Sequence, residues 1–341
     1  MLYTPPALTP YRERVSKEEL ARIAAGLQAG RWTAEVHQYH PRTLARTLLE
    51  RRPRLVFNLA YGYVAAKGVH QTQAEVTARL EALDAHLVGS SAAAQRGAQD
   101  KLACAEVLRP HGIRSPELIR LNRPGRMPDV AVVKPRFGAC HRGVHLVHPR
   151  ADREKLLRLR TDLLLQEYVE GPEYTVGVVE LAGQPTSLPV LRIRFADARR
   201  PQVMVAGHAI WHIEVDSRDQ YGLGALAVRC FRILRLRDYA RFDFRVDRRG
   251  PVLLDANALP NLEPTSSYLP LAARAAGVGY EELVNLLAES AMRRARGGCR
   301  QRQREQQRRA RVPQRDHRSS LSSRTRLDVS HRPPPRACTL P

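Results

Sequence analysis

Hydrophobic and polar positions in the first hundred residues alternate between short apolar runs and amphipathic segments. Residues 17–29 have the apolar spacing of a helix, with Ser16 before the first turn and Glu19 three residues later as a capping pair. Further helices are predicted at RTLARTLLERR and at about 71–84, and short strands at WTAEVHQYH, RLVFNLAYGY and HLVGS. This strand–helix alternation predicts a parallel α/β layer over residues 1–96.

The pattern changes after about Gln99 to strands joined by glycine-containing loops. DKLACAEVLRPHG predicts a helix that ends at Gly112, VAVVKPRFGACHRGVHLV predicts two strands, and LLLQEYVEGPEYTVGVVE predicts two more around the turn at 171–172. We interpret residues 97–180 as an antiparallel unit with helices packed on it, so that the fold class is mixed α/β and α+β.

A third unit is predicted over residues 181–292. It contains the strands LPVLRIRF and AGHAIWHIEV, a helix near 223–235, the hairpin RFDFRVDRRGPVLLDAN and a closing helix at about 280–291. A chain of 341 residues is long enough for two or three domains with a substantial core.

The net charge of +22 is unusual, and much of it comes from arginines after residue 293. Because this segment lacks apolar periodicity, we predict a disordered basic tail at 293–341. Such a tail could attract nucleic acid or a membrane surface, or it could be an extension without a selected role. We favour the second reading, because no aromatic residues interleave the arginines and nothing else indicates a nucleic-acid module.

The cysteines are scattered and form no C-x-x-C pair; they are Cys104, Cys140, Cys230, Cys299 and Cys338. The chain begins without a secretory apolar segment, and no apolar run approaches the roughly 20 residues of a membrane span. We therefore expect a reduced, cytoplasmic protein without a structural zinc site.

The strand register predicted for the hairpin near residue 250 brings acidic residues together. A three-residue loop at 248–250, with glycine in the left-handed position, is a favoured hairpin connection. This register places Asp243 opposite Asp255 and Arg241 opposite Asn257, and opposed Cβ atoms lie about 4.5–5.5 Å apart. These four side chains share one face, because positions two apart on a strand do so.

Two opposed carboxylates repel each other unless a cation lies between them, and a set of oxygen ligands suits Mg²⁺. The alternative is that both acids point to solvent and are neutralised by nearby arginines, and the hairpin alone leaves both readings open. The same register places Asp247 opposite Pro251 and turns Phe242, Phe244 and Leu254 to the other face.

Segments in this order resemble the ATP-grasp superfamily, and most closely the D-alanine–D-alanine ligases. They are VFNLAYGY, DKLACAEVLRPHGIRSPE, VVKPRFGACHRGV, QEYVEGPEYTVGVV and RFDFRVDRRGPVLLDANALPNLEPTS. The resemblance implies an ATP-grasp fold behind an amino-terminal α/β domain. It also implies an ATP-dependent carboxylate–amine ligase that forms an amide bond between amino acids through an acyl phosphate.

The resemblance also assigns roles to individual residues. The implied nucleotide-binding positions are Lys101, Lys134, Gly138, Gly143, Gln166, Glu167, Val169 and Glu173. The lysines would contact phosphates, the glycines would let the loop backbone cover them, 166–169 would contact adenine and Glu173 would contact the ribose. VVKP independently puts Lys134 at the end of an apolar strand, where a lone charge needs a partner.

The implied ligands for Mg²⁺ or Mn²⁺ are Asp243, Asp255 and Asn257. Arg241 would stabilise the oxyanion of the reaction, and Ser266 or Ser267 would receive the carboxylate of the second substrate. The alternative role for these two serines is helix capping.

The chain also departs from the ligase pattern. The start, MLYTPPALTPYRERVSKEELA, lacks the family's Gly-Gly loop and Glu-His-Glu motif, so the first strand is either absent or rebuilt. Asp255 stands in place of a glutamate, Asn261 in place of a glycine, and Ala139 and Cys140 in place of paired serines. A Lys-Tyr pair is missing from the mobile loop, where Arg199 or Arg200 could supply the charge.

These departures indicate altered recognition of the acyl donor beside an intact nucleotide and metal apparatus. The partners we expect are small amino-acid substrates, without a membrane or nucleic acid, and a homodimer is an option that the sequence leaves open. The alternative function is a catalytically impaired or non-enzymatic ATP-binding relative.

Overall fold

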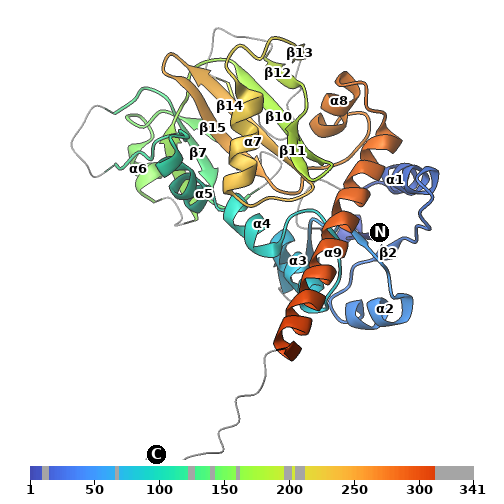
Figure 1. Cartoon of the computed structure of the whole chain (residues 1–341). Helices are drawn as coiled ribbons and strands as arrows, with labels where there is room; N and C mark the ends of the chain where they lie inside the picture. Colours follow the sequence, from blue (N-terminus) through green and yellow to red (C-terminus); the bar gives the residue numbers. More distant parts are fainter. Residues whose placement is uncertain are drawn as a thin grey trace, which may run out of the picture. The chain divides into compact units, whose positions relative to one another are not determined.

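The computed structural model describes residues 1–9, 15–65, 69–121, 127–138, 143–158, 162–195, 202–203 and 212–311. The chain divides into a compact unit over Met1–Gly297 and a second unit over Gly298–Pro341. The predicted mixture of α/β and α+β structure is confirmed in the described residues, where a parallel amino-terminal sheet is followed by antiparallel sheets (Figure 1).

The amino-terminal part contains a parallel sheet with strand order β2-β1-β3-β6. Its strands are β1 (Leu2–Tyr3), β2 (His37–Gln38), β3 (Val56–Leu59) and β6 (Leu87–Val88), and its helices are α1 (Lys17–Ala29), α2 (Leu44–Arg51), α3 (Gln73–Ala82) and α4 (Ala92–Gln99). Ser16 Oγ accepts from the N–H of Glu19 at 2.9 Å, which confirms the predicted cap of α1. The first strand is rebuilt rather than absent, since β1 lies between β2 and β3.

A short 3₁₀ helix, η1 (Pro6–Leu8), and an antiparallel hairpin, β4 (Gly62–Ala65) with β5 (Val69–Thr72), complete this part among the described residues. The hairpin lies between β3 and α3, where no strand pair was predicted, and α4 was likewise not predicted. AAAQRGAQ is short and carries no large apolar side chain, so it lacks the residues that usually mark the buried face of a helix.

The middle of the chain forms an antiparallel sheet with strand order β8-β7-β9. Its elements are α5 (Lys101–Leu108), η2 (Arg109–His111), β7 (Ala131–Pro135), β8 (His145–Val147), α6 (Arg153–Leu157) and β9 (Leu163–Glu167). The predicted stop at Gly112 is confirmed, because this residue has a left-handed φ of 72° after η2.

The larger sheet has strand order β13-β12-β10-β14-β15, with β11 paired to β10. Its elements are β10 (Glu173–Leu181), β11 (Gln184–Ser187), β12 (Val190–Arg194), β13 (His212–Asp216), α7 (Leu223–Ile233), β14 (Tyr239–Asp247), β15 (Gly250–Asn257) and α8 (Tyr268–Ala275). The predicted boundary at 180/181, which grouped β10 with the strands before it, is wrong, because β10 pairs with β14 from Glu173 to Val179.

Gly171 explains why the chain changes sheets between β9 and β10 instead of closing a hairpin. Its φ is 134°, and an added Cβ would lie 1.9 Å from the carbonyl oxygen of Val246. Only glycine permits this close approach to the start of the β14–β15 turn. The turn at 171–172 therefore delivers the chain to β14 rather than back to β9.

Two helices cover opposite faces of the larger sheet. α7 packs against the face that holds Tyr174, Val176 and Val178, and it crosses the sheet in Figure 1. α8 packs against the other face, where Gly177 makes room for Leu269. Side chains alternate along β10, so Glu173 and Thr175 lie on the face that α8 covers.

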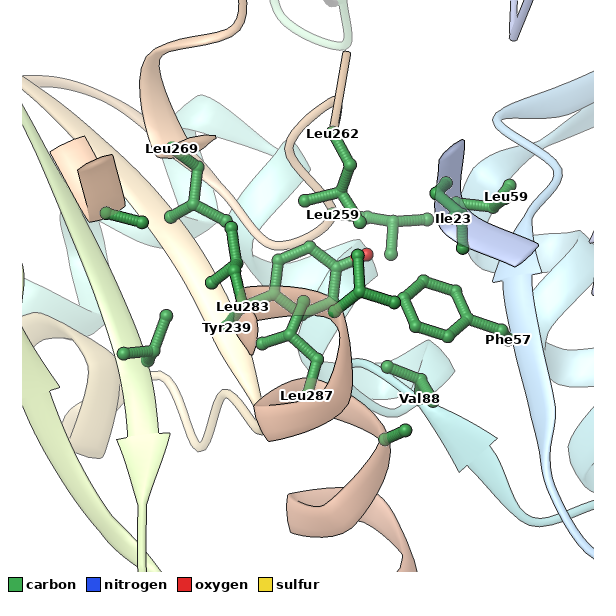
Figure 2. Close-up of a cluster of buried hydrophobic side chains, with 14 of the residues drawn as sticks. Ile23, Phe57, Leu59, Val88, Tyr239, Leu259, Leu262, Leu269, Leu283 and Leu287 are labelled. Atoms are coloured by element: carbon green, nitrogen blue, oxygen red, sulfur yellow. The ribbon is translucent and has the colours of Figure 1, made fainter. Parts of the chain in front are cut away.

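One apolar core joins the amino-terminal sheet to the larger sheet and to α9 (Tyr280–Arg311). Figure 2 shows Tyr239, at the start of β14, among Phe57 and Ile23 from the amino-terminal part and Leu283 and Leu287 from α9. Tyr239 is fully buried. Burial of apolar surface of this extent holds the amino-terminal part beside β14.

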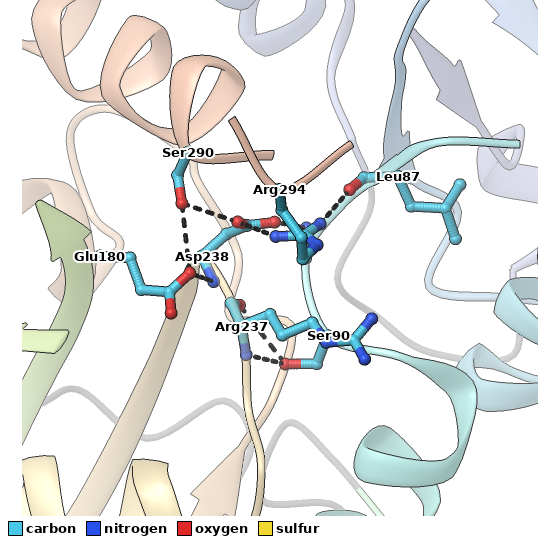
Figure 3. A network of polar contacts seen from close by, with 8 residues as sticks. Leu87, Ser90, Glu180, Arg237, Asp238, Ser290 and Arg294 are labelled. Atoms are coloured by element: carbon cyan, nitrogen blue, oxygen red, sulfur yellow. Dashed lines mark hydrogen bonds and ion pairs between the residues drawn. The ribbon is translucent and has the colours of Figure 1, made fainter. Parts of the chain in front are cut away.

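A buried polar network lies next to this core (Figure 3). Asp238 is 0% exposed; its Oδ2 accepts from the N–H of Gly89 at 2.6 Å, and its Oδ1 accepts from Ser290 Oγ at 2.9 Å. Arg294 forms an ion pair with Asp238 and donates to the carbonyl of Leu87 at 2.6 Å. Burial raises the pKa of Asp238, and Arg294 opposes that shift.

The participation of Arg294 corrects the prediction for the end of the chain. The closing helix was expected to end at about 291 and a disordered tail to begin at 293, but α9 continues to Arg311. Arginine, glutamine and alanine favour helix, and no proline interrupts the sequence before Pro313. Residues 312–341 of the predicted tail lie outside the described residues. Over the part of the chain that the structure describes, no helix is both long and apolar enough to cross a membrane.

We predict that Arg294→Met lowers the free energy of unfolding by about 3 kcal/mol, because it leaves the buried Asp238 carboxylate without its cation. Arg293→Met is the matched control, since the neighbouring Arg293 is exposed, and it should change stability by less than about 0.5 kcal/mol. Urea denaturation of the three proteins measures both values. Equal stability of the two variants would contradict a structural role for the Arg294–Asp238 pair.

Candidate active site

The hairpin of β14 and β15 pairs Asp243 with Asp255 and Arg241 with Asn257, as the sequence predicted. The predicted turn is wrong, however, because Asp247 pairs with Gly250 across a two-residue turn and not with Pro251. A β-bulge between Asp243 and Phe244 restores the expected pairing by inserting one extra residue in β15.

Leu254 is that extra residue, and this changes its environment. It was expected to face the core with Phe242 and Phe244, both of which are fully buried. Leu254 is instead only partly buried, and its carbonyl oxygen accepts from Lys134 Nζ at 3.2 Å. The bulge thereby turns a backbone acceptor toward a lysine at the end of β7.

Asp243 does not point to solvent, because its side chain is only 5% exposed. Arg241 donates from Nε to Oδ1 at 3.1 Å and from Nη2 to Oδ2 at 3.0 Å, and Thr175 Oγ1 donates to Oδ1 at 2.6 Å. Thr175 is the register partner of Asp243 on β10. Charge-assisted bonds of this kind compensate for the burial of the carboxylate.

Asp255 is more accessible, with a side chain that is 31% exposed. Lys101 Nζ lies 3.3 Å from its Oδ1. Burial alone would raise the pKa of Asp255, but the charges of Lys101, Lys134 and Arg241 outweigh it and leave the pKa lowered. The alternative reading was that both acids point to solvent and are neutralised by basic residues. Basic residues do lie beside both acids, but only Asp255 is partly exposed to solvent.

Lys134 is buried at the end of β7, with 9% of its surface exposed. Burial and the neighbouring charge of Lys101 lower its pKa to about 8. The two lysines and Arg241 therefore bring three cations to the two carboxylates of the hairpin. We call these five side chains the charge cluster; it contains one more basic than acidic side chain.

The loop after β7 approaches the same cluster. Gly138 accepts from Lys101 Nζ at 3.2 Å through its carbonyl oxygen, and Gly143 has a left-handed φ of 71°. A side chain at Gly143 would be strained by that backbone conformation. Residues 139–142, and with them Ala139 and Cys140, lie outside the described residues, as do Arg199 and Arg200.

Gln166 provides an acceptor inside a small pocket. The pocket lies between α5, β7, β9 and β15 and is lined by residues that include Lys101, Lys134 and Asp255. Gln166 is 4% exposed, and its Nε2 donates to the carbonyl of Pro116 at 3.4 Å. Its Oε1 is buried and accepts no hydrogen bond from any residue that the structure describes. A buried acceptor without a donor is costly and indicates a position where a ligand can donate.

Glu173 and Arg245 form a buried ion pair beside residues 166–169, the predicted adenine contacts. Both side chains are 4% exposed, and Arg245 Nε donates to Glu173 Oε2 at 2.9 Å. Burial raises the pKa of Glu173, and Arg245 opposes this shift. Arg245 Nη1 also donates to the carbonyl of Val169 at 3.0 Å, while Glu167 Oε1 accepts from the N–H of Glu117 at 3.2 Å.

Arg245 and Thr175 were missed in the sequence analysis. For Arg245 a signal was present, because residues 241, 243 and 245 share one face of a strand by their spacing of two. Thr175 has no such signal in the sequence, since its contact with Asp243 depends on the pairing of β10 with β14.

The two candidate serines lie just before α8. Ser266 Oγ donates to Glu263 at 2.6 Å, and Ser267 Oγ donates to Asn261 Oδ1 at 2.9 Å. Ser267 is the N-cap residue of α8 but makes no side-chain capping bond. The next residue, Tyr268, packs its ring at 5.1 Å from the Arg241 guanidinium, so the start of α8 adjoins the charge cluster.

Two other kinds of site receive no support in the described residues. No group of three His, Cys, Asp or Glu side chains is placed to hold a metal ion in the part of the chain that the structure describes. The predicted metal set differs in kind, because it combines two carboxylates with the amide of Asn257. Cys104 borders the pocket, but burial raises its pKa to about 12, so its thiol stays protonated.

The chain is similar in sequence to known proteins. A family model described as the D-ala D-ala ligase C-terminus matches residues 131–289. The D-alanine–D-alanine ligase of Syntrophotalea carbinolica is 30% identical over 246 residues, which cover 68% of this chain and 79% of that protein. The uncharacterized protein y4sG of Sinorhizobium fredii is 30% identical over 265 residues, which cover 72% of this chain and 77% of that protein.

The fold is also similar to a solved structure. The D-alanine–D-alanine ligase from Bacillus anthracis complexed with ATP superimposes with a TM-score of 0.62 at 21% sequence identity, over 87% of this chain and 98% of that chain. The expected ATP-grasp fold is thereby confirmed. The chain belongs to the D-alanine–D-alanine ligase family.

Proposed function

We propose that this protein is an ATP-dependent ligase that joins the carboxylate of one amino acid to the amine of another through an acyl phosphate. The observation that carries the proposal is the charge cluster at the end of the β14–β15 hairpin. There Lys101, Lys134 and Arg241 surround Asp243 and Asp255, with distances of 3.3 Å and 3.0 Å in the two ion pairs. A cluster with excess positive charge and two anionic oxygen ligands suits a metal–triphosphate complex.

The nucleotide would lie along β7, β9 and β10. Lys101 and Lys134 would contact the phosphates, and the loop from Gly138 to Gly143 would cover them with backbone N–H groups. The unpaired Oε1 of Gln166 supports a contact with the exocyclic amine of adenine. Glu167 would contribute backbone groups to the same adenine site.

Two further groups would complete the nucleotide site. The carbonyl of Val169 already accepts from Arg245, so we assign the backbone N–H of Val169 to a ring nitrogen of adenine. Both Arg245 contacts of Glu173 are to Oε2, which leaves Oε1 for a ribose hydroxyl. Arg245 therefore orients the carboxylate that would bind the sugar.

Asp243, Asp255 and Asn257 fit a magnesium or manganese ion by the chemistry of their donors, since two carboxylates, each with a basic side chain beside it, lie next to an amide oxygen. A bound ion would supply charge neutralisation to the phosphates of ATP. Each carboxylate already has a protein cation beside it. Lys101 and Arg241 therefore neutralise the two carboxylates, and a bound ion would leave both side chains available to the substrates.

In the proposed reaction, a carboxylate oxygen of the first substrate attacks the γ-phosphorus and ADP leaves. The amine of the second substrate then attacks the acyl carbon, and phosphate leaves with the donor's oxygen. Arg241 would stabilise the oxyanion of this second step, held in place by the ring of Tyr268. The protein thus contributes alignment and charge neutralisation rather than a covalent intermediate.

Ser266 or Ser267 would receive the carboxylate of the second substrate. Each serine hydroxyl carries one hydrogen, and both hydrogens are already donated, to Glu263 and to Asn261. Binding a substrate carboxylate therefore requires one of these bonds to be exchanged. The alternative of a catalytically impaired relative has no specific support in these observations.

A coupled assay of ADP release over pairs of D- and L-amino acids tests the proposed function. We expect release that depends on Mg²⁺ and on both substrates, and a loss of at least about a hundredfold in kcat/KM in Asp243→Ala and Lys134→Ala. Normal turnover by both variants would refute the assignment of the site. An absence of release with every pair, despite ATP binding, would favour the impaired relative.

Gln166→Leu removes the acceptor that we assign to adenine. Loss of one neutral hydrogen bond should raise the KM for ATP by about two- to tenfold and reduce the preference for ATP over GTP. Gln166→Glu keeps an acceptor and should retain the preference for ATP. Steady-state kinetics with both nucleotides measures the effect, and an unchanged KM in Gln166→Leu would contradict the adenine contact.

The lowered pKa of Lys134 predicts a pH dependence of nucleotide binding. Its ammonium form predominates below about pH 8 and is lost above it, so the affinity for the phosphates should fall as the pH rises through that value. The KM for ATP should then rise by up to about tenfold per pH unit. Lys134→Arg stays charged over this range and should lack the rise. The same slope in both proteins would assign the titration to another group.

A further inference from the structure

The loop that follows the proposed metal ligand Asn257 is held by a residue far away in the sequence. Gln73 is the first residue of α3, in the amino-terminal part, and it is 6% exposed. Its Nε2 donates to the carbonyl oxygen of Leu259 at 3.3 Å, across a separation of 186 residues. The side chain of Leu259 lies in the shared core that Figure 2 shows. The contact is therefore buried and joins the two parts of the compact unit.

Gln99, the last residue of α4, fixes the orientation of the Gln73 amide. Its Nε2 donates to Gln73 Oε1, so the nitrogen end of the Gln73 amide faces Leu259. A carbonyl oxygen only accepts, so the reverse orientation would place two acceptors together at Leu259. Thr77 Oγ1 also donates to the backbone carbonyl of Gln73 at 3.1 Å. Both ends of Gln73 are thus held within the amino-terminal part.

The peptide groups of Leu259 connect this contact to the metal strand. The N–H of Leu259 donates to Asn257 Oδ1 at 3.1 Å, while its C=O accepts from Gln73. Leu259 thus orients the oxygen of Asn257 that would bind the ion, and Gln73 holds Leu259 through its carbonyl group. An amide oxygen has two lone pairs, so it can accept from Leu259 and also bind a metal ion.

We propose that Gln73 is a positioning residue for the metal site, acting through Leu259 on the amide of Asn257, and that Gln99 supports it by orienting its amide. The inference rests on the proposed function, since it takes Asn257 as a ligand. It assigns the amino-terminal part a role in ordering the metal strand, in addition to any contact with the acyl donor. Groups that orient metal ligands in this way commonly affect affinity for the metal.

Calorimetric titration of Mn²⁺ into the full-length protein with a non-hydrolysable ATP analogue tests the proposal without turnover. Gln73→Met should weaken Mn²⁺ binding by about three- to tenfold, the effect of losing one neutral hydrogen bond. Gln99→Met should have a smaller effect in the same direction. The double variant should bind no more weakly than Gln73→Met, because both residues act through one contact.

Tyr39→Phe is the matched control, because it removes a buried 2.7 Å bond to Gln71 in the same part of the chain without touching Leu259. It should bind Mn²⁺ as the wild type does. Gln73→Glu provides a second variant of nearly equal volume, which keeps the acceptor for Gln99 but cannot donate to Leu259. It should lose at least as much affinity as Gln73→Met, because it also sets two acceptors together.

The outcomes separate this proposal from the proposed function. Wild-type Mn²⁺ affinity in both Gln73 variants, together with weakened binding in Asn257→Ala, would overturn the positioning role and leave the metal site intact. Wild-type affinity in Asn257→Ala would overturn the metal site itself, and the positioning role with it. Equal weakening in Tyr39→Phe and Gln73→Met would reduce the effect to general destabilisation and also overturn the proposal.

Discussion

The opposition of Asp243 and Asp255 across two neighbouring strands is the constraint on which the rest of the site depends. Two carboxylates at this spacing, one of them buried, are stable only if cations and donors surround them. Thr175, Arg241 and Lys101 provide these contacts from β10, β14 and α5. Lys134 adds a third cation, whose burial is reflected in its pKa of about 8. The arrangement holds more positive charge than the acids require, which is what a triphosphate with its metal ion would use.

The amino-terminal part is attached to this site by three kinds of contact. Apolar burial around Tyr239 holds the amino-terminal sheet against β14, and the ion pair of Asp238 with Arg294 ties α9 to the same junction. Gln73 adds a directional bond to the loop after the metal strand. The apolar core supplies most of the free energy that holds the amino-terminal part against the larger sheet. The polar contacts fix the relative placement, because a buried donor or acceptor tolerates little displacement without losing its partner.

The fold class and the pairing of the two acids could be predicted from the sequence, but the path to that pairing could not. An assumed three-residue turn gave the correct register only because the true two-residue turn is followed by a bulge at Leu254. Sequence periodicity does not reveal a bulge, although this one presents the carbonyl of Leu254 to Lys134. Sequence periodicity likewise does not reveal contacts between distant segments, such as those of Thr175 with Asp243 and of Gln73 with Leu259. The extension of α9 was missed because a charged, weakly apolar helix lacks the pattern by which helices are recognised.

The central claim is that the charge cluster transfers a phosphoryl group from ATP to a carboxylate. Transfer of ¹⁸O tests it most directly, with the carboxylate donor labelled in both oxygens and the phosphate product analysed by mass spectrometry. Attack of the carboxylate on the γ-phosphorus, followed by attack of the amine on the acyl carbon, predicts one labelled oxygen in each phosphate released. Phosphate without label, formed at the same rate as ADP, would mean that water is the nucleophile and would contradict the account.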